Sequence, residues 1–302
     1  MIIRHKKIWF GLSGLAVGIS VVATVMFGLN LGIDFTGGSL LELTFTQTRP
    51  NSQAVVDALS ALDLSAVAQP IGEQGMILRF KEVDEATHQS ILQTLRNTFL
   101  LETGQGAEVF EELRFESIGP TIGQELKTKT VWAIGIIALA IILYITWAFR
   151  KVSQPVASWK YGLVAVIALF HDVMITVGVF ALLGQFYNIE VNASFIAALL
   201  TILGYSVNDT IVVFDRTREN LLKNDNDDFE AVVEKSVKEV ITRSINASLT
   251  VLLVLFAILL LGGATIREFA LALIIGISAG SYSSLFLASP LLVALEKWRH
   301  RA

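Results

Sequence analysis

One apolar run of the sequence, residues 200–220, contains side chains that could carry chemistry. Asn208 and Asp209 lie in it, well before the charged cluster that begins at Asp215. If the run crosses a membrane, a charge near its centre costs about 2.5–3.5 kcal/mol and needs a partner or a wet cavity. A carboxyl group in such an interior can take up a proton when isolated and release it when a cation approaches. Asp209 is therefore a candidate ion-coupling residue.

A candidate cation for Asp209 is Arg243, which lies in a later apolar run. Asp209 lies six residues before Asp215, and Arg243 lies five residues after Lys238. With about 1.5 Å of helical rise per residue, both side chains would lie roughly 8–9 Å inside their flanking charges. This matching depth indicates an ion pair. The pair would serve either as an ion relay or as a structural contact that only fixes helix register.

Other polar residues recur at helical spacing in the same runs. They form two stripes: Thr201, Tyr205, Asn208 and Asp209 in the first, and Arg243, Asn246 and Thr250 in the second. We expect such stripes to point inward, away from lipid. A third apolar run contains the neighbouring pair His171 and Asp172. This pair either belongs to the ion-coupling site or simply hydrogen-bonds to neighbouring helices.

Composition indicates that these apolar runs lie in a membrane. Of the 302 residues, 53% are hydrophobic and only 17% are charged, and the mean hydropathy is +0.62. These values do not describe an ordinary soluble domain. The net charge of −4 says little about partners, because the distribution of basic residues among the loops matters more in a membrane protein. No nucleic-acid partner is suggested.

Several classes of active site are excluded by what the sequence lacks. The chain contains no cysteine, which excludes a disulfide framework, a thiolate metal site and a cysteine nucleophile. It also lacks a P-loop, an HExxH motif and a recognisable nucleophile motif. We therefore expect no enzymatic activity, no metal site and no cofactor.

Six apolar stretches approach the roughly 20 helical residues that span a hydrocarbon core. They are residues 8–31, 130–149, 161–185, 193–214, 241–262 and 269–295. The first exceeds the roughly 7–15 apolar residues of a secretory signal, and no small-residue cleavage site follows it, so a retained anchor is expected. Basic residues fall on one side of six such spans: Arg4, Lys6, Lys7, Arg150, Lys151, Lys160, Arg216, Arg218, Lys223, Lys297, Arg299 and Arg301. That side is predicted to be the cytoplasm.

The long polar segment between the first two spans is predicted to form a small folded domain. Strands are expected at residues 39–46, 66–69, 75–80 and 108–117. One helix is expected to be capped by Ser52 and to run to Leu64, and a second helix should follow a capping Asp84. The order βαββαβ is that of a ferredoxin-like α+β domain. The expected domains are a cytoplasmic N-terminus with the first span (residues 1–31), an extracytoplasmic domain (residues 32–127), and spans two to six (residues 128–302).

Glycines mark two further features. Gly37 and Gly38 follow the sequence IDFT, and we interpret them as turn residues that let the chain leave a membrane helix and enter a strand. In the sixth span, Gly276, Gly280 and Ser284 recur every four residues and allow another helix to approach closely. Ordinary packing within the chain is the simpler explanation of that spacing.

Four segments carry a resemblance to a known family. They are LGIDFTGGS at residues 31–39, HDV at 171–173, ASFIAALLTILGYSVNDTIVVFDRTREN at 193–220 and ITRSINASLT at 241–250. Together they resemble the SecD/SecF family of bacterial protein-export membrane proteins, which is similar to the resistance-nodulation-division transporters. The resemblance covers essentially the whole chain. It implies a polytopic helical protein that supplies six spans to a twelve-span pair.

The resemblance also implies a function and a site. A family member works with a SecD-type partner and the SecYEG channel, uses the proton-motive force or a sodium gradient, and promotes late steps of preprotein export across the bacterial inner membrane. YajC and membrane lipid are further expected partners. The family's ion-conducting aspartate and arginine match Asp209 and Arg243, and Asn208 and Asp172 are additional candidates. Asp34, Gly37 and Gly38 form the expected junction that couples the membrane helices to the extracytoplasmic domain.

Two other functions remain open at this point. The chain could be half of an ion-driven exporter of small amphiphiles, although such exporters usually fuse two six-span repeats with large porter domains. It could also be a passive scaffold that stabilises a channel. A neighbouring SecD-like reading frame would favour the export function over both.

Overall fold

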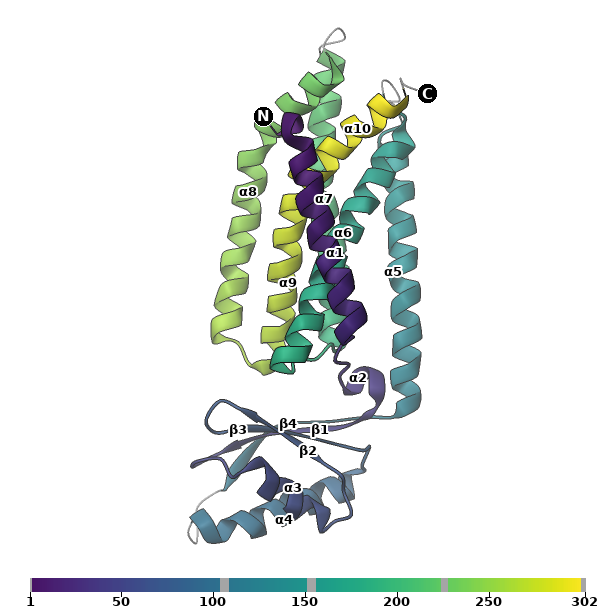
Figure 1. The fold of residues 1–302 in the computed structure, drawn as a ribbon. Coiled ribbons are helices and arrows are strands. Elements are labelled where there is room, and N and C mark those ends of the chain that lie inside the picture. The colour runs from purple at the N-terminus through teal and green to yellow at the C-terminus, as the bar shows by residue number, and fades with distance from the viewer. Residues whose placement is uncertain (1, 104–108, 151–155, 224–227, 300–302) are drawn as a thin grey trace. The chain divides into compact units, whose positions relative to one another are not determined.

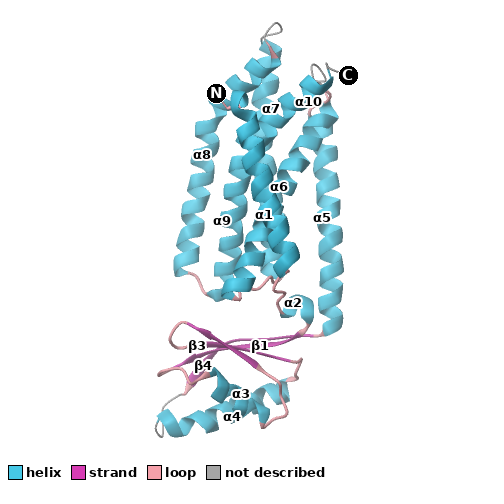
Figure 2. Cartoon of the chain, viewed as in Figure 1, coloured by secondary structure: helices cyan, strands magenta, loops and turns pink. Residues whose placement is uncertain are grey.

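The computed structural model describes the chain apart from residues 1, 104–108, 151–155, 224–227 and 300–302 (Figure 1). The chain divides into two compact units. One unit contains Met1–Asn30 and Thr130–Ala302 and is a helix bundle, whereas Leu31–Lys129 forms a smaller α+β unit. Figure 2 shows that the strands all lie in the smaller unit.

Six helical segments of the described chain are long and apolar enough to cross a membrane, which confirms the predicted spans. The bundle consists of the short helix η1 (Ile3–His5), α1 (Lys6–Phe27), α5 (Pro120–Ala148), α6 (Ser158–Tyr187), α7 (Ala193–Lys223), α8 (Phe229–Leu261), α9 (Ala264–Ser283), the π-helical turn η2 (Ser284–Ala288) and α10 (Ser289–Arg299). The last three run on from one another as a single span. The chain is therefore a multi-pass membrane protein.

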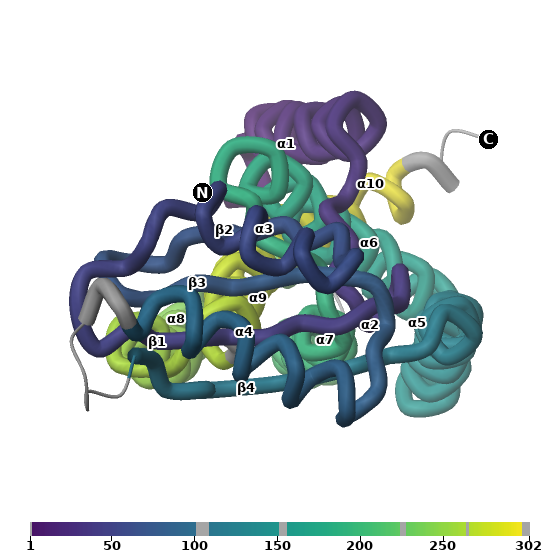
Figure 3. Tube along the Cα trace, turned by 90° about the horizontal axis from the view of Figure 1, so that it is seen from below, coloured from purple at the N-terminus to yellow at the C-terminus, as the bar shows by residue number. Residues whose placement is uncertain are grey.

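The bundle has a buried centre and an exposed periphery. The most apolar stretches of α6, of α7 and of the last span, which includes most of α9, have the largest share of buried residues, and those of α1, α5 and α8 have the smallest share. Helices α5 and α8 lie on opposite sides of the bundle (Figures 1 and 3). Polar groups on the inner helices must therefore find partners within the chain, whereas those on the outer faces need lipid-tolerant or protein neighbours.

The small residues of the sixth span pack against α7. A Cβ atom added at Gly276 would lie 2.2 Å from Cδ1 of Ile202, and one added at Gly280 would lie 2.9 Å from Cβ of Ser206. Ser284 of the predicted stripe begins the π-helical turn. The expectation of ordinary packing within the chain is confirmed, and this close approach brings the polar side chains of α7 and α9 together.

The α+β unit has the predicted βαββαβ order. After the short helix α2 (Ile33–Thr36) its elements are β1 (Gly38–Phe45), α3 (Ser52–Ser60), β2 (Val67–Ile71), β3 (Gly75–Phe80), α4 (Glu85–Thr103) and β4 (Phe110–Ile118). In the described residues the strands form one antiparallel sheet in the order β2-β3-β1-β4. Helices α3 and α4 both cover the same face of this sheet (Figure 2).

The core of this unit follows from the two-residue period of its central strand. Leu41, Leu43 and Phe45 of β1 are buried on the face that α4 covers with Ile91 and Leu95. Alternate positions of a strand point to one face, and helix positions four apart share a face, so these residues meet without any polar group between them. The unit thus closes its own hydrophobic core.

Two helix starts in this unit differ in how well they were predicted. Asp84 caps α4 as expected, since its Oδ1 accepts a hydrogen bond from the Thr87 amide at 2.9 Å. The cap of α3 is Asn51 and not Ser52, because Asn51 Oδ1 accepts from the amide of Gln53 at 3.0 Å. Helix α3 also ends at Ser60. Position 108, the predicted start of β4, lies outside the described residues.

Candidate functional site

Asp209 lies on the inward face of α7 and is 5% exposed. Its Oδ2 accepts one long hydrogen bond of 3.4 Å from Oγ of Ser248 on α8. Ser248 in turn accepts from Oγ of Ser281 on α9 at 2.6 Å. A buried carboxylate normally has several donors, so this group is only weakly satisfied by its own chain.

Arg243 does not pair with Asp209 in the structure. The predicted partner is exposed and makes no ion pair in the described part of the chain, and Asn208 is likewise exposed. On α8 the inward positions are Ser244 and Ser248. Consecutive helical residues are rotated by about 100°, so Arg243 stands at the rim, although its depth matches that of Asp209. The expected ion pair is therefore absent from this single chain.

Most members of the two predicted polar stripes are exposed. Asp209 is buried and Tyr205 is half-buried, but the remaining members are exposed: Thr201, Asn208, Arg243, Asn246 and Thr250. The expectation that both stripes face the interior of the bundle was wrong for this chain by itself. Polar groups at membrane depth are rarely left facing lipid. This exposed edge of α7 and α8, the polar edge, therefore requires a protein neighbour or a water-filled space.

Asp172 on α6 has a contrasting environment. It is fully buried, and Oδ2 accepts hydrogen bonds from Ser206 of α7 at 2.5 Å and from Ser283 of α9 at 2.9 Å. Its Oδ1 lies 2.9 Å from Nδ1 of His171. The structure thus contains the hydrogen bonds to neighbouring helices that were one of the two expectations. Ser206 and Ser283 were not singled out from the sequence.

Serine hydroxyls connect the surroundings of the two carboxylates. Ser206 lies three residues before Asp209 on α7, and both side chains are buried. Ser281 of α9 hydrogen-bonds to Ser248, which in turn hydrogen-bonds to Asp209. Ser283 of α9 hydrogen-bonds directly to Asp172. Close packing of α7 on glycines of α9 makes these contacts possible. The interior of the bundle therefore has two acidic centres that share neighbouring helices.

The predicted junction lies in the α+β unit. Asp34 is half-buried in the first turn of α2, and the two following glycines have backbone angles φ of +74° and +126°. A Cβ atom at Gly37 would lie 2.8 Å from Cα of Pro120, and one at Gly38 would lie 2.9 Å from the carbonyl oxygen of Phe80. Both positions thus need glycine for conformation and for space. The junction packs directly against the start of α5.

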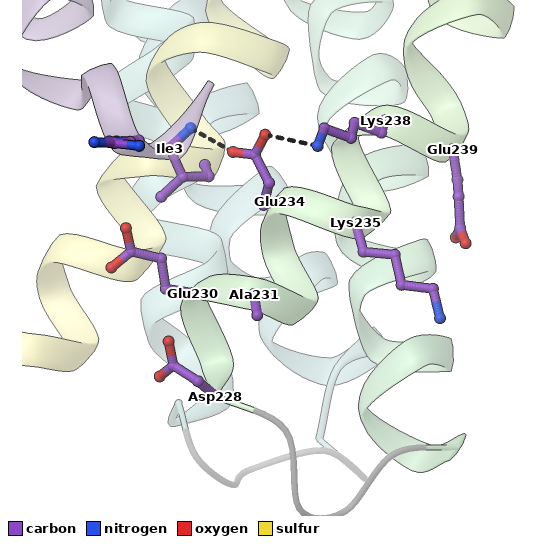
Figure 4. A pocket seen from close by; sticks show the side chains of 9 residues that line it. Ile3, Asp228, Glu230, Ala231, Glu234, Lys235, Lys238 and Glu239 are labelled. Atoms are coloured by element: carbon purple, nitrogen blue, oxygen red, sulfur yellow. Dashed lines mark hydrogen bonds and ion pairs between the residues drawn. The ribbon is translucent and has the colours of Figure 1, made fainter. Parts of the chain in front are cut away.

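A charged hollow of ≈ 590 Å³ lies where η1 meets the beginning of α8 (Figure 4). The Glu234 carboxylate accepts hydrogen bonds from the amides of Ile2 at 3.0 Å and Ile3 at 2.8 Å, and Lys238 lies 3.4 Å from it. The buried Ile3 side chain completes this anchor. Sequence reasoning missed this anchor, because nothing in the pattern of Glu234 separates it from the solvated charges around it.

Comparison with known proteins shows the family of this chain. The family model described as protein export membrane protein SecD/SecF, C-terminal, matches residues 100–298, and the SecD/SecF GG motif matches residues 22–48. The protein translocase subunit SecF of Thermobaculum terrenum is 40% identical over 98% of this chain and 93% of its own length. The subunit of the same description from Anaerolinea thermophila is 38% identical over 99% of this chain and 96% of its own length.

A solved structure shares the whole fold. The crystal structure of SecDF, a translocon-associated membrane protein from Thermus thermophilus, superposes with a TM-score of 0.80 and 31% sequence identity. The match covers 99% of this chain but 38% of the SecDF chain. A second SecDF structure, in a super-membrane-facing form, gives a TM-score of 0.64. The polar edge of α7 and α8 thus belongs to a chain whose solved relative is considerably longer.

Proposed function

Because the chain belongs to the SecD/SecF family of protein-export membrane proteins, we propose that it works as the SecF-type subunit of a Sec translocase. With a SecD-type partner it uses the proton-motive force to promote late stages of protein export. The observation that carries this proposal is the incomplete site at Asp209. That buried carboxylate has one long hydrogen bond, and it lies beside a polar edge that nothing in the described chain covers.

The polar edge supports a partner with membrane helices. Asn208 and Arg243 are exposed on segments long and apolar enough to span a bilayer. A partner bundle packed on α7 and α8 would desolvate both side chains and give them hydrogen-bonding groups. A SecD-type protein is such a partner. The SecYEG channel, preprotein substrates, YajC and lipid are the further partners in this proposal.

The residues of the site suit proton coupling. Asp209 takes up a proton while no cation is near it and releases the proton when Arg243 moves in from the rim. Ser248 supplies a hydroxyl that can hydrogen-bond either state of the carboxyl group, and Ser281 donates a hydrogen bond to Ser248. Asn208 lines the same rim, and its amide can hold water beside the carboxylate. The protein thus acts as an ion-driven motor component and not as an enzyme.

The proposed membrane orientation follows from the basic residues. Residues 1–31 and the loops and tail of residues 128–302 carry the basic clusters and face the cytoplasm of the bacterial inner membrane, with both termini inside. Residues 32–127 then lie on the far side. The junction of Asp34, Gly37 and Gly38 transmits helix movement to that domain. Its glycines pack so closely against the start of α5 and the end of β3 that a side chain would not fit there.

Cysteine labelling tests this orientation without background, since the natural chain contains no cysteine. Thr87→Cys in the α+β unit should react with an impermeant thiol reagent added outside intact cells. Leu222→Cys, at an exposed position near the end of α7, should react only after the cells are opened. Labelling of Leu222→Cys from outside would refute the proposed orientation.

The central experiment measures preprotein translocation into vesicles with and without an imposed proton gradient. Asp209→Asn keeps the size and hydrogen-bonding capacity of the side chain but cannot change its charge, so gradient stimulation should disappear while the complex remains assembled. Asp215→Asn is the matched control, because it makes the same change at an exposed position of the same helix. It should retain stimulation.

The double variant Asp209→Asn with Arg243→Gln separates a relay from a structural pair. A relay predicts that export is not restored. Recovery of export in the double variant would mean that the two residues only fix helix register. Gradient stimulation that survives in Asp209→Asn alone would refute proton coupling at this site.

A further inference from the structure

His171 has one ring nitrogen that the bundle leaves without a partner. The residue is 3% exposed, and its Nδ1 lies 2.9 Å from Oδ1 of Asp172. Its Nε2 is fully enclosed and makes no hydrogen bond to any described residue. Buried polar atoms are nearly always hydrogen-bonded, so an enclosed ring nitrogen without a partner suggests a function or a missing ligand.

His171 is one of the residues that line a groove of ≈ 440 Å³ between α1, α6 and α9. The groove is lined by His171 and mostly by apolar side chains, with Ser13 of α1, Ser278 and Tyr282 of α9 as its other polar residues. The Tyr282 ring stacks on His171 with centroids 6.0 Å apart, and its hydroxyl accepts from Ser13 at 3.2 Å. Tyr282 thus holds the imidazole in place while its own hydroxyl is bonded to α1.

The contacts of Asp172 determine which nitrogen carries hydrogen. Its carboxylate accepts from Ser206 and Ser283 through one oxygen, so its second oxygen is available to accept from Nδ1–H of His171. In a neutral ring, Nε2 is then the bare nitrogen with a lone pair. The pair carries one net negative charge in this state. A proton taken up by Nε2 cancels the net charge of the pair.

We propose that His171 and Asp172 form a second proton-binding site of the bundle, in which His171 Nε2 accepts the proton and Asp172 positions the ring. The proton comes from a water molecule or hydronium ion that reaches the groove. Nδ1–H stays on Asp172, and no covalent bond between heavy atoms forms or breaks. This inference rests on the proposed proton coupling and adds a site to it.

The neighbourhood of His171 contains few competing charges. The titratable groups that face it are Asp172 on its own helix and Tyr282 on α9, while α1 presents Ser13. Asp209 approaches only through α7, where Ser206 separates it from Asp172. Proton uptake at His171 therefore places a positive charge beside the carboxylate to which Ser206 and Ser283 donate. Through these two serines it also alters the packing of α7 and α9, which carry the surroundings of Asp209.

A titration of the ring tests the site directly. In the complex of the full chain with its SecD-type partner, His5, His88 and His300 are replaced by glutamine, which leaves His171 as the only histidine of this chain. With nitrogen-15 histidine incorporated into this chain only, both ring resonances should change reversibly between about pH 5 and pH 9, and the bare nitrogen at high pH should be Nε2. Resonances that do not move across this range would overturn the proposal.

Asp172→Asn in the same background tests the positioning role. An amide cannot fix the ring as a carboxylate acceptor does, so at high pH the nitrogen-15 resonances should show a mixture of the two neutral tautomers. A folded complex in which Nε2 stays the bare nitrogen would contradict the positioning role.

Proton flux into vesicles that contain the complex gives the functional readout. His171→Asn keeps an amide donor near the place of Nδ1 but has no Nε2, so gradient-driven flux should fall on the order of a hundredfold. His88→Gln is the control, because it replaces a buried histidine outside the helix bundle and should leave flux unchanged. If Asp209→Asn abolishes flux but His171→Asn does not, only this inference fails. If Asp209→Asn itself retains flux, the proposed function fails.

Discussion

The α+β unit and the helix bundle satisfy their polar groups in different ways. In the α+β unit the buried Ser39 hydroxyl lies 2.8 Å from Ser117 Oγ and accepts from the Val83 amide at 3.1 Å. In the bundle Asp172 is equally well satisfied, but Arg243 stays exposed and unpaired in the described part of the chain. The first unit therefore completes its structure with its own residues. In the second, the edge of α7 and α8 leaves Arg243 without an ion-pair partner among the described residues.

This difference indicates where a partner is needed. A soluble surface can leave an arginine in water at little cost, whereas a membrane-spanning segment cannot leave one in lipid. The stability of the α+β unit should therefore not depend on a partner. The edge formed by α7 and α8 should be stabilised when a partner binds, and Asp172 should behave alike in both states.

The largest expected effect on stability is at Asp172. Asp172→Ala leaves the donors Ser206, Ser283 and His171 buried without their acceptor, so the chain should lose about 3 kcal/mol of its unfolding free energy. Denaturant unfolding of the purified chain in detergent, alone and with its partner, measures this loss. It should be the same in both, because the contacts are internal.

Arg243→Gln provides the matching test at the edge. It should leave the unfolding of the isolated chain unchanged within about 0.5 kcal/mol, because the side chain is exposed there. In the complex it should weaken association. A destabilised isolated chain, or a complex as stable as the natural one, would remove the distinction between the two sides of the bundle.

At the glycine junction of the α+β unit, the expected loss of unfolding free energy is somewhat smaller than that expected for Asp172→Ala. Gly37→Ala combines a left-handed backbone with a contact of 2.8 Å to Pro120, so it should destabilise this unit by about 2–3 kcal/mol. Gly72→Ala is the control, because Gly72 has φ of +57° and open space around it. It should cost only about 1 kcal/mol. Hydrogen exchange of the β1 amides measures the stability of the α+β unit in both variants. Equal losses of stability would show that the contact with Pro120 does not contribute to the effect of Gly37→Ala.

Sequence reasoning predicted those features that follow from the periodicity of apolar residues or from local composition. The six spans follow from hydropathy, the βαββαβ order follows from alternating patterns, and the inward position of Asp209 follows from the cost of a buried charge. The position of Arg243 could not be obtained in this way. Depth along a helix depends on residue counts alone, whereas the direction of a side chain depends on how α8 is rotated in the bundle.

Two other features were beyond the sequence for related reasons. Ser206 and Ser283 look like any small residues at helix contacts, and only the glycine packing of α9 against α7 places them on Asp172. Asn51 and Ser52 are both good capping residues at adjacent positions, so composition alone does not choose between them. In each case the choice depends on tertiary contacts that no local pattern encodes.

The smallest expected effect concerns the helix cap of α4. Hydrogen bonds from Thr87 lower the pKa of the exposed Asp84 carboxyl below its usual value. A lowered pKa in the folded state means that the cap stabilises the protein above the pKa of the unfolded chain, about 3.9, and that this contribution is lost as the pH falls through the folded value. At pH 7, Asp84→Ala should lower the Tm of the α+β unit by about 2–8 °C.

The Tm values of the natural protein and of Asp84→Ala should approach each other as the pH is lowered. As the pH falls below about 3.9, the pKa of the unfolded chain, and on through the lower pKa of the folded protein, the contribution of the cap is lost, so the Tm difference from Asp84→Ala should narrow. Asp84→Asn is the control, because an amide oxygen caps a helix without titrating, and its Tm relative to Asp84→Ala should not depend on pH in this range. Thermal unfolding followed by circular dichroism between pH 7 and about pH 3 measures all three proteins. If binding of the SecD-type partner changed these differences, the α+β unit would not be self-sufficient, and its contrast with the polar edge of the bundle would fail.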